Sequence, residues 1–150
     1  MDKIFFFYFL ERWCYLHHLT LIAIIIRTFI RITFSADIPY KLKIGKGTKM
    51  PHDALGSVFH PDAVIGNNCI IRQGVTIGGR SGNSQLPILE DYVDVGAHAQ
   101  ILGPIVLGHH STIGAGAIVV KDVPPYAVVV GNPAHIIKYN TPTNKYTSKK

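Results

Sequence analysis

Aliphatic and aromatic residues return at every sixth position through the centre of the chain. A period of six fits neither the 3.6-residue period of an α-helix nor the two-residue alternation of an ordinary strand. It is typical of a parallel β-helix, in which each hexad supplies one short strand and one turn. The sequence therefore predicts an all-β fold, with a β-sandwich of short strands as the alternative. The repeated positions are Phe59, Ile65, Ile71, Ile77, Leu89, Val95, Ile101, Leu107, Ile113 and Val119.

Three hexads are expected to close one triangular coil, with the repeated residue pointing inward. A small or branched residue four positions later, such as Ala63 or Cys69, also faces the interior, and glycine often follows the repeated residue, as in Ile65-Gly66. Coils stacked at about 4.8 Å, the spacing of paired strands, allow backbone groups to pair with the next coil. The predicted core is a column of isoleucine, valine and leucine.

The period is interrupted twice. An upstream block, Ile38, Ile44 and Met50, keeps the six-residue step, but three extra residues separate it from Phe59. The second interruption is the polar stretch 80–87 (RSGNSQLP), where the repeated position falls on an asparagine. Because neither insertion has a core residue to bury, we expect exposed loops, and insertions in repeat proteins often carry function.

The first 34 residues are apolar and are predicted to be helical. Their runs IFFFYFL and LTLIAIII are shorter than the roughly 20 residues that span a bilayer, and no small-residue cleavage site follows them, so a secretory signal is not expected. Arg27 and Arg31 are four apart and share one helix face. The segment is interpreted as helices packed on the β-helix or on a partner subunit. A peripheral membrane anchor is the second interpretation.

Composition limits the partners and the compartment. The 150 residues carry a formal net charge of +6, and part of this charge lies in the polar tail 139–150, which is predicted to be disordered. Lysines and arginines do not cluster with aromatic residues, so nucleic acid is not an expected partner. Cys14 and Cys69 form no disulfide framework, which favours a reducing, cytoplasmic location. The domain organisation is thus a helical segment at 1–34, a β-helix at 35–138 and a tail.

Several motifs give the repeat a family resemblance. IGKG at 44–47, GVTIGG at 74–79, ILGPI at 101–105 and the long stretch 113–138 resemble hexapeptide-repeat acyltransferases. The similarity covers about residues 36–138 and is greatest to the serine-acetyltransferase-like branch, which includes capsule and exopolysaccharide O-acetyltransferases. This resemblance implies a left-handed β-helix, a homotrimer, and acetyl-CoA as acyl donor, bound in the groove between subunits.

A histidine and an aspartate match the catalytic pair of that branch. The family pattern has Asp-Ile near the first coil and a histidine fifteen residues later, and this chain has Asp37-Ile38 and His52. A neutral imidazole can remove the proton of a hydroxyl as it attacks the thioester, and a carboxylate on the other ring nitrogen orients the base. The resemblance thus implies His52 as general base and Asp37 as its partner. The alternative is a turn aspartate and an exposed loop histidine.

The resemblance also implies positions that contact acetyl-CoA. Backbone at glycines and small corner residues would admit the pantetheine arm, and lysines would meet the nucleotide phosphates, although β-helix geometry alone also explains the small residues. His98 and Arg80 are further candidates for lining the groove. The expected cofactor-binding residues are Gly78, Gly79, Ala97, Ala115, Lys121 and Lys138.

The acceptor is predicted from departures from the family pattern. Serine acetyltransferases carry an acidic residue before the histidine, where this chain has Pro51, and an Arg-His pair before the proline of the long loop, where it has Gln85-Leu86. Their large N-terminal helical domain is also replaced by about 34 residues. A neutral sugar does not need these charged partners, so the predicted acceptor is a sugar hydroxyl of a surface polysaccharide or its precursor. Serine is the alternative acceptor.

Two other function classes share the fold. Zinc-dependent carbonic anhydrases with this fold bind the metal through three histidines from adjacent subunits. His98, His109 and His110 are candidates, but their spacing does not match the usual pair five residues apart, and no metal is expected. A non-catalytic scaffold would keep the repeats without requiring Asp37 and His52.

Overall fold

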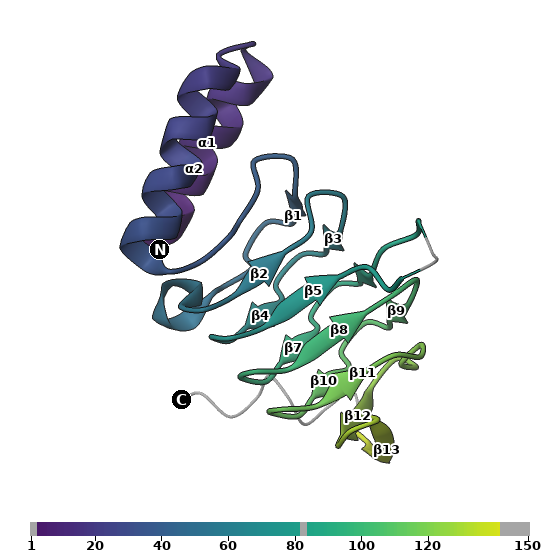
Figure 1. Cartoon of the computed structure of the whole chain (residues 1–150). Helices are drawn as coiled ribbons and strands as arrows, with labels where there is room; N and C mark the ends of the chain where they lie inside the picture. Colours follow the sequence, from purple (N-terminus) through teal and green to yellow (C-terminus); the bar gives the residue numbers. More distant parts are fainter. Residues whose placement is uncertain (1–2, 82–83, 142–150) are drawn as a thin grey trace.

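The computed structural model describes residues 3–81 and 84–141, which form a left-handed parallel β-helix with a helical hairpin at its N-terminal end (Figure 1). The predicted all-β fold is confirmed. Residues 142–150 of the predicted disordered tail, and the repeat position at residue 83, lie outside the described residues.

Within the described residues, the β-helix has three faces, each a sheet of short stacked strands. Sheet A contains β2 (Val58–Phe59), β5 (Thr76–Gly78), β8 (Gln100–Leu102) and β11 (Ile118–Val119). Sheet B contains β1 (Lys43–Ile44), β3 (Val64–Ile65), β6 (Ile88–Leu89) and β9 (Val106–Leu107). Sheet C contains β4 (Ile70–Ile71), β7 (Asp94–Val95), β10 (Thr112–Ile113), β12 (Ala127–Val130) and β13 (His135–Tyr139).

The strand register shows how the two insertions fit into the coils. Ile88 pairs with Val106, eighteen residues on, which is one regular coil of three hexads. Val64 pairs with Ile88 across the long loop, so that coil has 24 residues. Lys43 pairs with Val64, so the coil that contains the first insertion has 21. The extra residues therefore leave the coil as loops and do not shift the register of the core.

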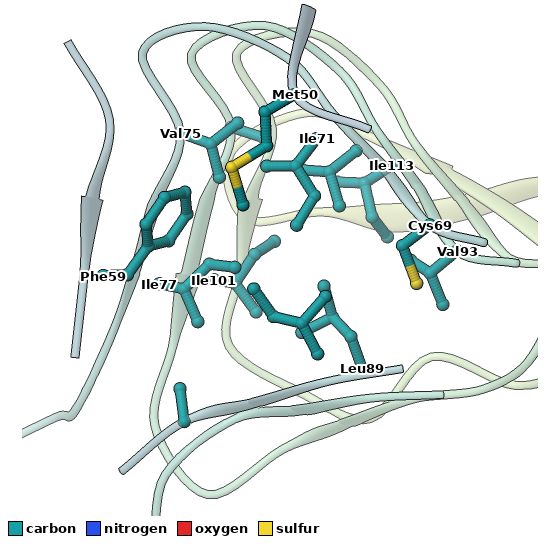
Figure 2. Packing of buried hydrophobic residues seen from close by; sticks show 14 of the residues in the cluster. Met50, Phe59, Cys69, Ile71, Val75, Ile77, Leu89, Val93, Ile101 and Ile113 are labelled. Atoms are coloured by element: carbon teal, nitrogen blue, oxygen red, sulfur yellow. The ribbon is translucent and has the colours of Figure 1, made fainter. Parts of the chain in front are cut away.

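The repeated residues fill the interior of the coils as the period predicts. Phe59, Ile77 and Ile101 are at most 2% exposed and point to the inside of the triangle (Figure 2). Met50, from the upstream register, is also fully buried and joins this column. Burial of aliphatic side chains stabilises a fold by roughly 25 cal/mol per Å² of apolar surface. Stacking of inward residues is therefore the main source of cohesion along the coil axis.

At two corners, polar side chains form hydrogen bonds with backbone groups of the neighbouring coil. The buried hydroxyl of Ser57 accepts a hydrogen bond from the Val75 N–H at 3.1 Å. The Thr48 hydroxyl accepts from the Cys69 N–H at 3.1 Å and donates to the Gly66 carbonyl at 2.8 Å. Cys69 is fully buried and acts as a small core residue, and this burial raises the pKa of its thiol.

Two antiparallel helices, α1 (Lys3–Leu16) and α2 (Thr20–Phe34), form the hairpin. The Tyr8 hydroxyl donates to the Leu42 carbonyl at 2.6 Å, and Arg12 donates to the Tyr40 carbonyl at 2.9 Å. These bonds attach α1 to the turn that follows Asp37, and burial raises the pKa of Tyr8 to about 12. Among the described residues, no helix is both long enough and apolar enough to cross a membrane.

A short antiparallel pair ends the β-helix. Strand β12 pairs in parallel with β10 and antiparallel with β13, which is exposed along its whole length. The preceding segment returns beside sheet A, because the Ala134 N–H donates to the Ile118 carbonyl at 2.9 Å. This terminal segment covers the last coil, which has no further repeat to stack on it.

Candidate functional site

Both insertions lie at the edges of sheet A. The first, around 50–57, connects Lys49, which bridges to sheet C, with β2 and so forms the corner between sheets C and A. The second, 79–87, connects β5 with β6 at the corner between sheets A and B. Sheet A is therefore the face whose two edges carry the non-repetitive parts of the chain (Figure 1).

His52 lies in the first insertion, within the short 3-10 turn η1 (Pro51–Ala54). His52, Asp53 and Ala54 all have left-handed backbone conformations, with φ between 51° and 59°, which is uncommon for residues other than glycine. The His52 side chain is exposed. Asp53 Oδ1 accepts from the Ile4 N–H at 3.1 Å, so the start of α1 fixes this turn. The loop presents an accessible imidazole from an ordered backbone.

Asp37 continues sheet A by one row beyond β2. Its backbone forms a parallel bridge with Val58, and its N–H donates to the Ser57 carbonyl at 2.9 Å. Asp37 thus occupies the first row of sheet A, while His52 lies at the corner that leads into β2. Both members of the predicted pair lie at the same end of sheet A, but among the described residues no hydrogen bond or ion pair joins His52 to Asp37. It also gives the Asp37 carboxylate a partner that the sequence analysis did not assign, Arg27.

His98 and two small residues lie at the C–A corner in later coils. Ala97 accepts from the Gly116 N–H at 2.8 Å, and Ala115 follows one coil on. A Cβ atom at Gly74 would lie 2.2 Å from Nδ1 of His98, so the imidazole covers this glycine. Gly74 in turn donates to the Leu55 carbonyl of the first insertion. His98 therefore lies on the same corner as His52, one coil beyond Gly74.

The other candidates lie at the opposite edge of sheet A. Gly78 ends β5, and a Cβ atom there would meet nothing within 4 Å, whereas at Gly79 it would approach Leu86 to 3.2 Å. Arg80 and Lys121 line one open pocket of about 650 Å³, together with Ser81, Pro104, Ile105, Val120 and Asp122. Two cationic side chains from different coils thus line the same pocket at the A–B corner, where they could neutralise phosphate groups.

Two sets of predicted residues are not brought into this arrangement. Lys138 lies on β13, paired with Val128 on sheet C, and not with the residues of the A–B corner. Of the three histidines considered for zinc, His98 is at the C–A corner, whereas His109 and His110 are at the corner between sheets B and C. There, His110 stacks between Tyr92 and Tyr126, with ring centroids 4.7 and 5.1 Å away.

Sequence reasoning missed the charged cluster that the hairpin brings to Asp37. Arg27 donates twice to Asp37 Oδ1, and Arg31 Nη1 lies 3.9 Å from Oδ2. Glu11 of α1 is fully buried, and burial raises its pKa to about 8, opposed by the charge of Arg27. The four-residue spacing of the arginines signalled a shared face. The spacing does not show that this face of α2 contacts Asp37, because the contact depends on how the hairpin packs against the β-helix.

Serine acetyltransferases match this chain in sequence and in structure. The serine acetyltransferase of Escherichia coli K12 is 41% identical over 118 residues, which are 77% of this chain and 43% of that protein. The Mycobacterium tuberculosis enzyme is 40% identical over 136 residues, 89% of this chain and 59% of that protein. Serine acetyltransferase of Brucella abortus, solved in complex with coenzyme A, superposes with a TM-score of 0.84 at 34% identity, over 90% of this chain and 54% of that one.

The chain spans about half the length of the relatives it matches. No family model matches it.

The predicted sugar acceptor and the predicted place in polysaccharide biosynthesis are wrong. The serine acetyltransferases reported above match over most of the chain, which favours the alternative acceptor, serine. The prediction relied on local departures at Pro51 and Gln85-Leu86. The departures concern three positions, whereas the match covers 77–89% of the chain. Single contact positions vary more readily than a scaffold does, so they are a weak guide to the acceptor.

Proposed function

We propose that this chain, a homologue of serine acetyltransferases among the hexapeptide-repeat acyltransferases, transfers an acetyl group from acetyl-CoA to the hydroxyl of serine. The observation that carries the proposal is the match of 40–41% identity over 77–89% of the chain. The arrangement of candidate residues around sheet A supports it, because base and phosphate-binding candidates occupy the two edges of one face.

In the proposed reaction, His52 is the general base. Its imidazole takes the proton of the serine hydroxyl while the oxygen attacks the thioester carbonyl of acetyl-CoA. The new C–O bond forms, the C–S bond breaks, and the proton returns to the departing CoA sulfur. The products are O-acetylserine and CoA with a free thiol. Asp37 holds the imidazole in the productive tautomer and stabilises its cationic form.

The proposed position of acetyl-CoA follows the edges of sheet A. Arg80 and Lys121 would meet its phosphates at the A–B corner, and the open space beside Gly78 would admit the pantetheine arm. The first row of sheet A, at Asp37, is four strand spacings from β11, which corresponds to about 19 Å along the coil axis. A long, flexible arm is suited to that separation. A groove between the subunits of a trimer would enclose it.

Release of free thiol from acetyl-CoA tests the proposal directly. We expect L-serine to accelerate thiol release, and L-alanine, which lacks only the hydroxyl, to leave the rate at the background of acetyl-CoA hydrolysis. Mass spectrometry should then show the acetyl group on the serine oxygen. If L-serine and L-alanine give the same rate at saturating acetyl-CoA, serine is not the acceptor and the proposed function is wrong.

A further inference from the structure

The second helix of the hairpin contacts Asp37, one member of the candidate catalytic pair. Arg27 Nε lies 3.0 Å and Nη2 lies 2.8 Å from the same Oδ1 atom of Asp37. The Asp37 side chain is 19% exposed and that of Arg27 is 31% exposed, so the pair is largely screened from water. A charge-assisted bond with two donors from one guanidinium fixes a carboxylate more closely than a single flexible ammonium can.

Arg27 occupies one oxygen of Asp37 and leaves the other less constrained. Among the described residues, Oδ2 has only a looser ion pair with Arg31, at 3.9 Å. Glu11 of α1 also faces this cluster, since its ionisation is opposed by Asp37 and favoured by Arg27. Two arginines from α2 and one buried carboxyl from α1 thus lie close to Asp37.

The same hairpin also fixes the loop that carries His52. The Gly56 N–H donates to the carbonyl of Ser35, the residue that ends α2, at 3.0 Å. At the other end of the loop, Asp53 accepts from the first turn of α1. Both halves of the candidate pair are therefore held by the hairpin, Asp37 through a side chain and His52 through its backbone surroundings.

We infer that Arg27 is a positioning residue for acetyl transfer, which fixes the Asp37 carboxylate through Oδ1 at the end of sheet A where the His52 loop lies. The inference rests on the proposed function, because it assigns a task to Asp37 only if His52 is the base. In this role Arg27 acts through the orientation of the Asp37 carboxylate, to which it donates both hydrogen bonds. The N-terminal hairpin is then part of the catalytic apparatus of this chain and not only a cover for the first coil.

Kinetics of the Arg27→Gln variant test this role in the full chain. A misplaced catalytic group costs up to about 100-fold in rate, so we expect kcat to fall by about 10- to 100-fold. KM for acetyl-CoA should stay unchanged, because the phosphate-binding candidates lie at the other edge of sheet A. Arg27→Lys keeps the positive charge but loses the planar guanidinium with its two parallel donors, so it should give an intermediate kcat.

Arg12→Gln is the matched control. Arg12 also ties the hairpin to the β-helix, but its partners are the backbone carbonyls of Tyr40 and Leu42. We expect Arg12→Gln to lower the unfolding temperature while kcat stays near that of the wild type. If Arg12→Gln and Arg27→Gln lower kcat equally, Arg27 only anchors the hairpin and the inference is wrong.

A double-mutant cycle with Asp37→Asn separates positioning from a general loss of structure. If Arg27 acts through Asp37, Arg27→Gln should change the kcat of Asp37→Asn by less than about twofold, since effects of coupled residues do not add. Independent effects would multiply and would contradict the inference. If Arg27→Gln does not fold, the same comparison is made with Arg27→Lys.

The outcomes distinguish this inference from the proposed function. An active wild type whose His52→Ala and Asp37→Asn variants are impaired, but whose Arg27→Gln variant has normal or raised kcat, would overturn only the positioning role. A wild type that does not acetylate serine would overturn the proposed function, and the role assigned to Arg27 with it.

Discussion

Three successive residues in the left-handed conformation determine where the candidate base lies. His52, Asp53 and Ala54 turn the first insertion tightly, and the Leu55 N–H closes the turn on the His52 carbonyl at 3.1 Å. The imidazole projects from the C–A corner, where it is exposed. Because the turn is held by backbone bonds and by Asp53, the side chain of His52 contributes little to the fold.

Replacement of this side chain should therefore separate activity from stability. We expect His52→Ala to lower kcat by about 100-fold or more, the usual contribution of a general base, while the thermal unfolding temperature changes little. The measurement is thiol release with L-serine, alongside a circular dichroism melt. His60→Ala, at the corner between sheets A and B, serves as the control. An equal loss of kcat in both variants would exclude a specific role for His52.

Glu11 gives the stability of the chain a dependence on pH. Burial raises its pKa from an ordinary 4.5 to about 8, so the folded state holds the proton more tightly than the unfolded chain does. The free energy of unfolding contributed by this group is fully present below about pH 4.5 and is lost as pH rises to about 8. The loss is on the order of a few kcal/mol.

Glu11→Gln removes this titration and keeps the shape of the side chain. Urea unfolding at pH 5 and pH 9 should show that the variant and the wild type are similarly stable at pH 5. At pH 9 the variant should be the more stable protein. Parallel stability curves across this range would show that Glu11 does not retain its proton in the folded state.

At the scale of elements, the close stacking of coils depends on glycines that face backbone. A Cβ atom at Gly66 would lie 2.6 Å from the carbonyl carbon of Glu90 in the next coil. Real Cβ atoms do not approach backbone so closely. The Glu90 backbone cannot easily move aside, because its N–H donates to the Leu107 carbonyl of the following coil at 3.0 Å. The frequent glycine after the repeated residue thus permits the close approach of successive coils at this corner.

Gly66→Ala should destabilise the fold by about 2 kcal/mol, because overpacking forces the coils apart. Gly78→Ala is the matched control for stability, since its Cβ would meet no atom within 4 Å. Chemical unfolding of both variants measures the difference. Equal stability of the two variants would mean that the corner at Gly66 can relax.

At the scale of the whole molecule, one chain presents candidate residues at both edges of sheet A but does not enclose them. The pocket with Arg80 and Lys121 is open, and the His52 side chain is exposed. Many apolar side chains of the hairpin are also exposed, among them Phe6, Trp13 and Ile32. The proposed reaction requires that water be kept from the thioester, and a second subunit that covers this face would complete such a site.

A trimer is therefore expected in solution, as the family resemblance implies. Sedimentation equilibrium should give a mass of about three times the 16.5 kDa of one chain. Saturating coenzyme A should stabilise this assembly, since a ligand held between subunits favours the state that binds it. A monomer at micromolar concentration, with full activity, would contradict a groove between subunits.

The sequence by itself determined the coil, the inward column and the two insertions, because a six-residue period leaves one way to bury its apolar positions. Through the family resemblance it also suggested Asp37 and His52 as the catalytic pair, which stays a prediction. Its interpretation of the acceptor failed, because the residues that meet an acceptor are few and follow no period. The placement of both insertions at the edges of sheet A, and of Arg27 on Asp37, was decided only by the tertiary structure. These contacts join separate segments of the chain. Their approach depends on the packing of the hairpin and on the lengths of the loops, and hydrophobic periodicity encodes neither.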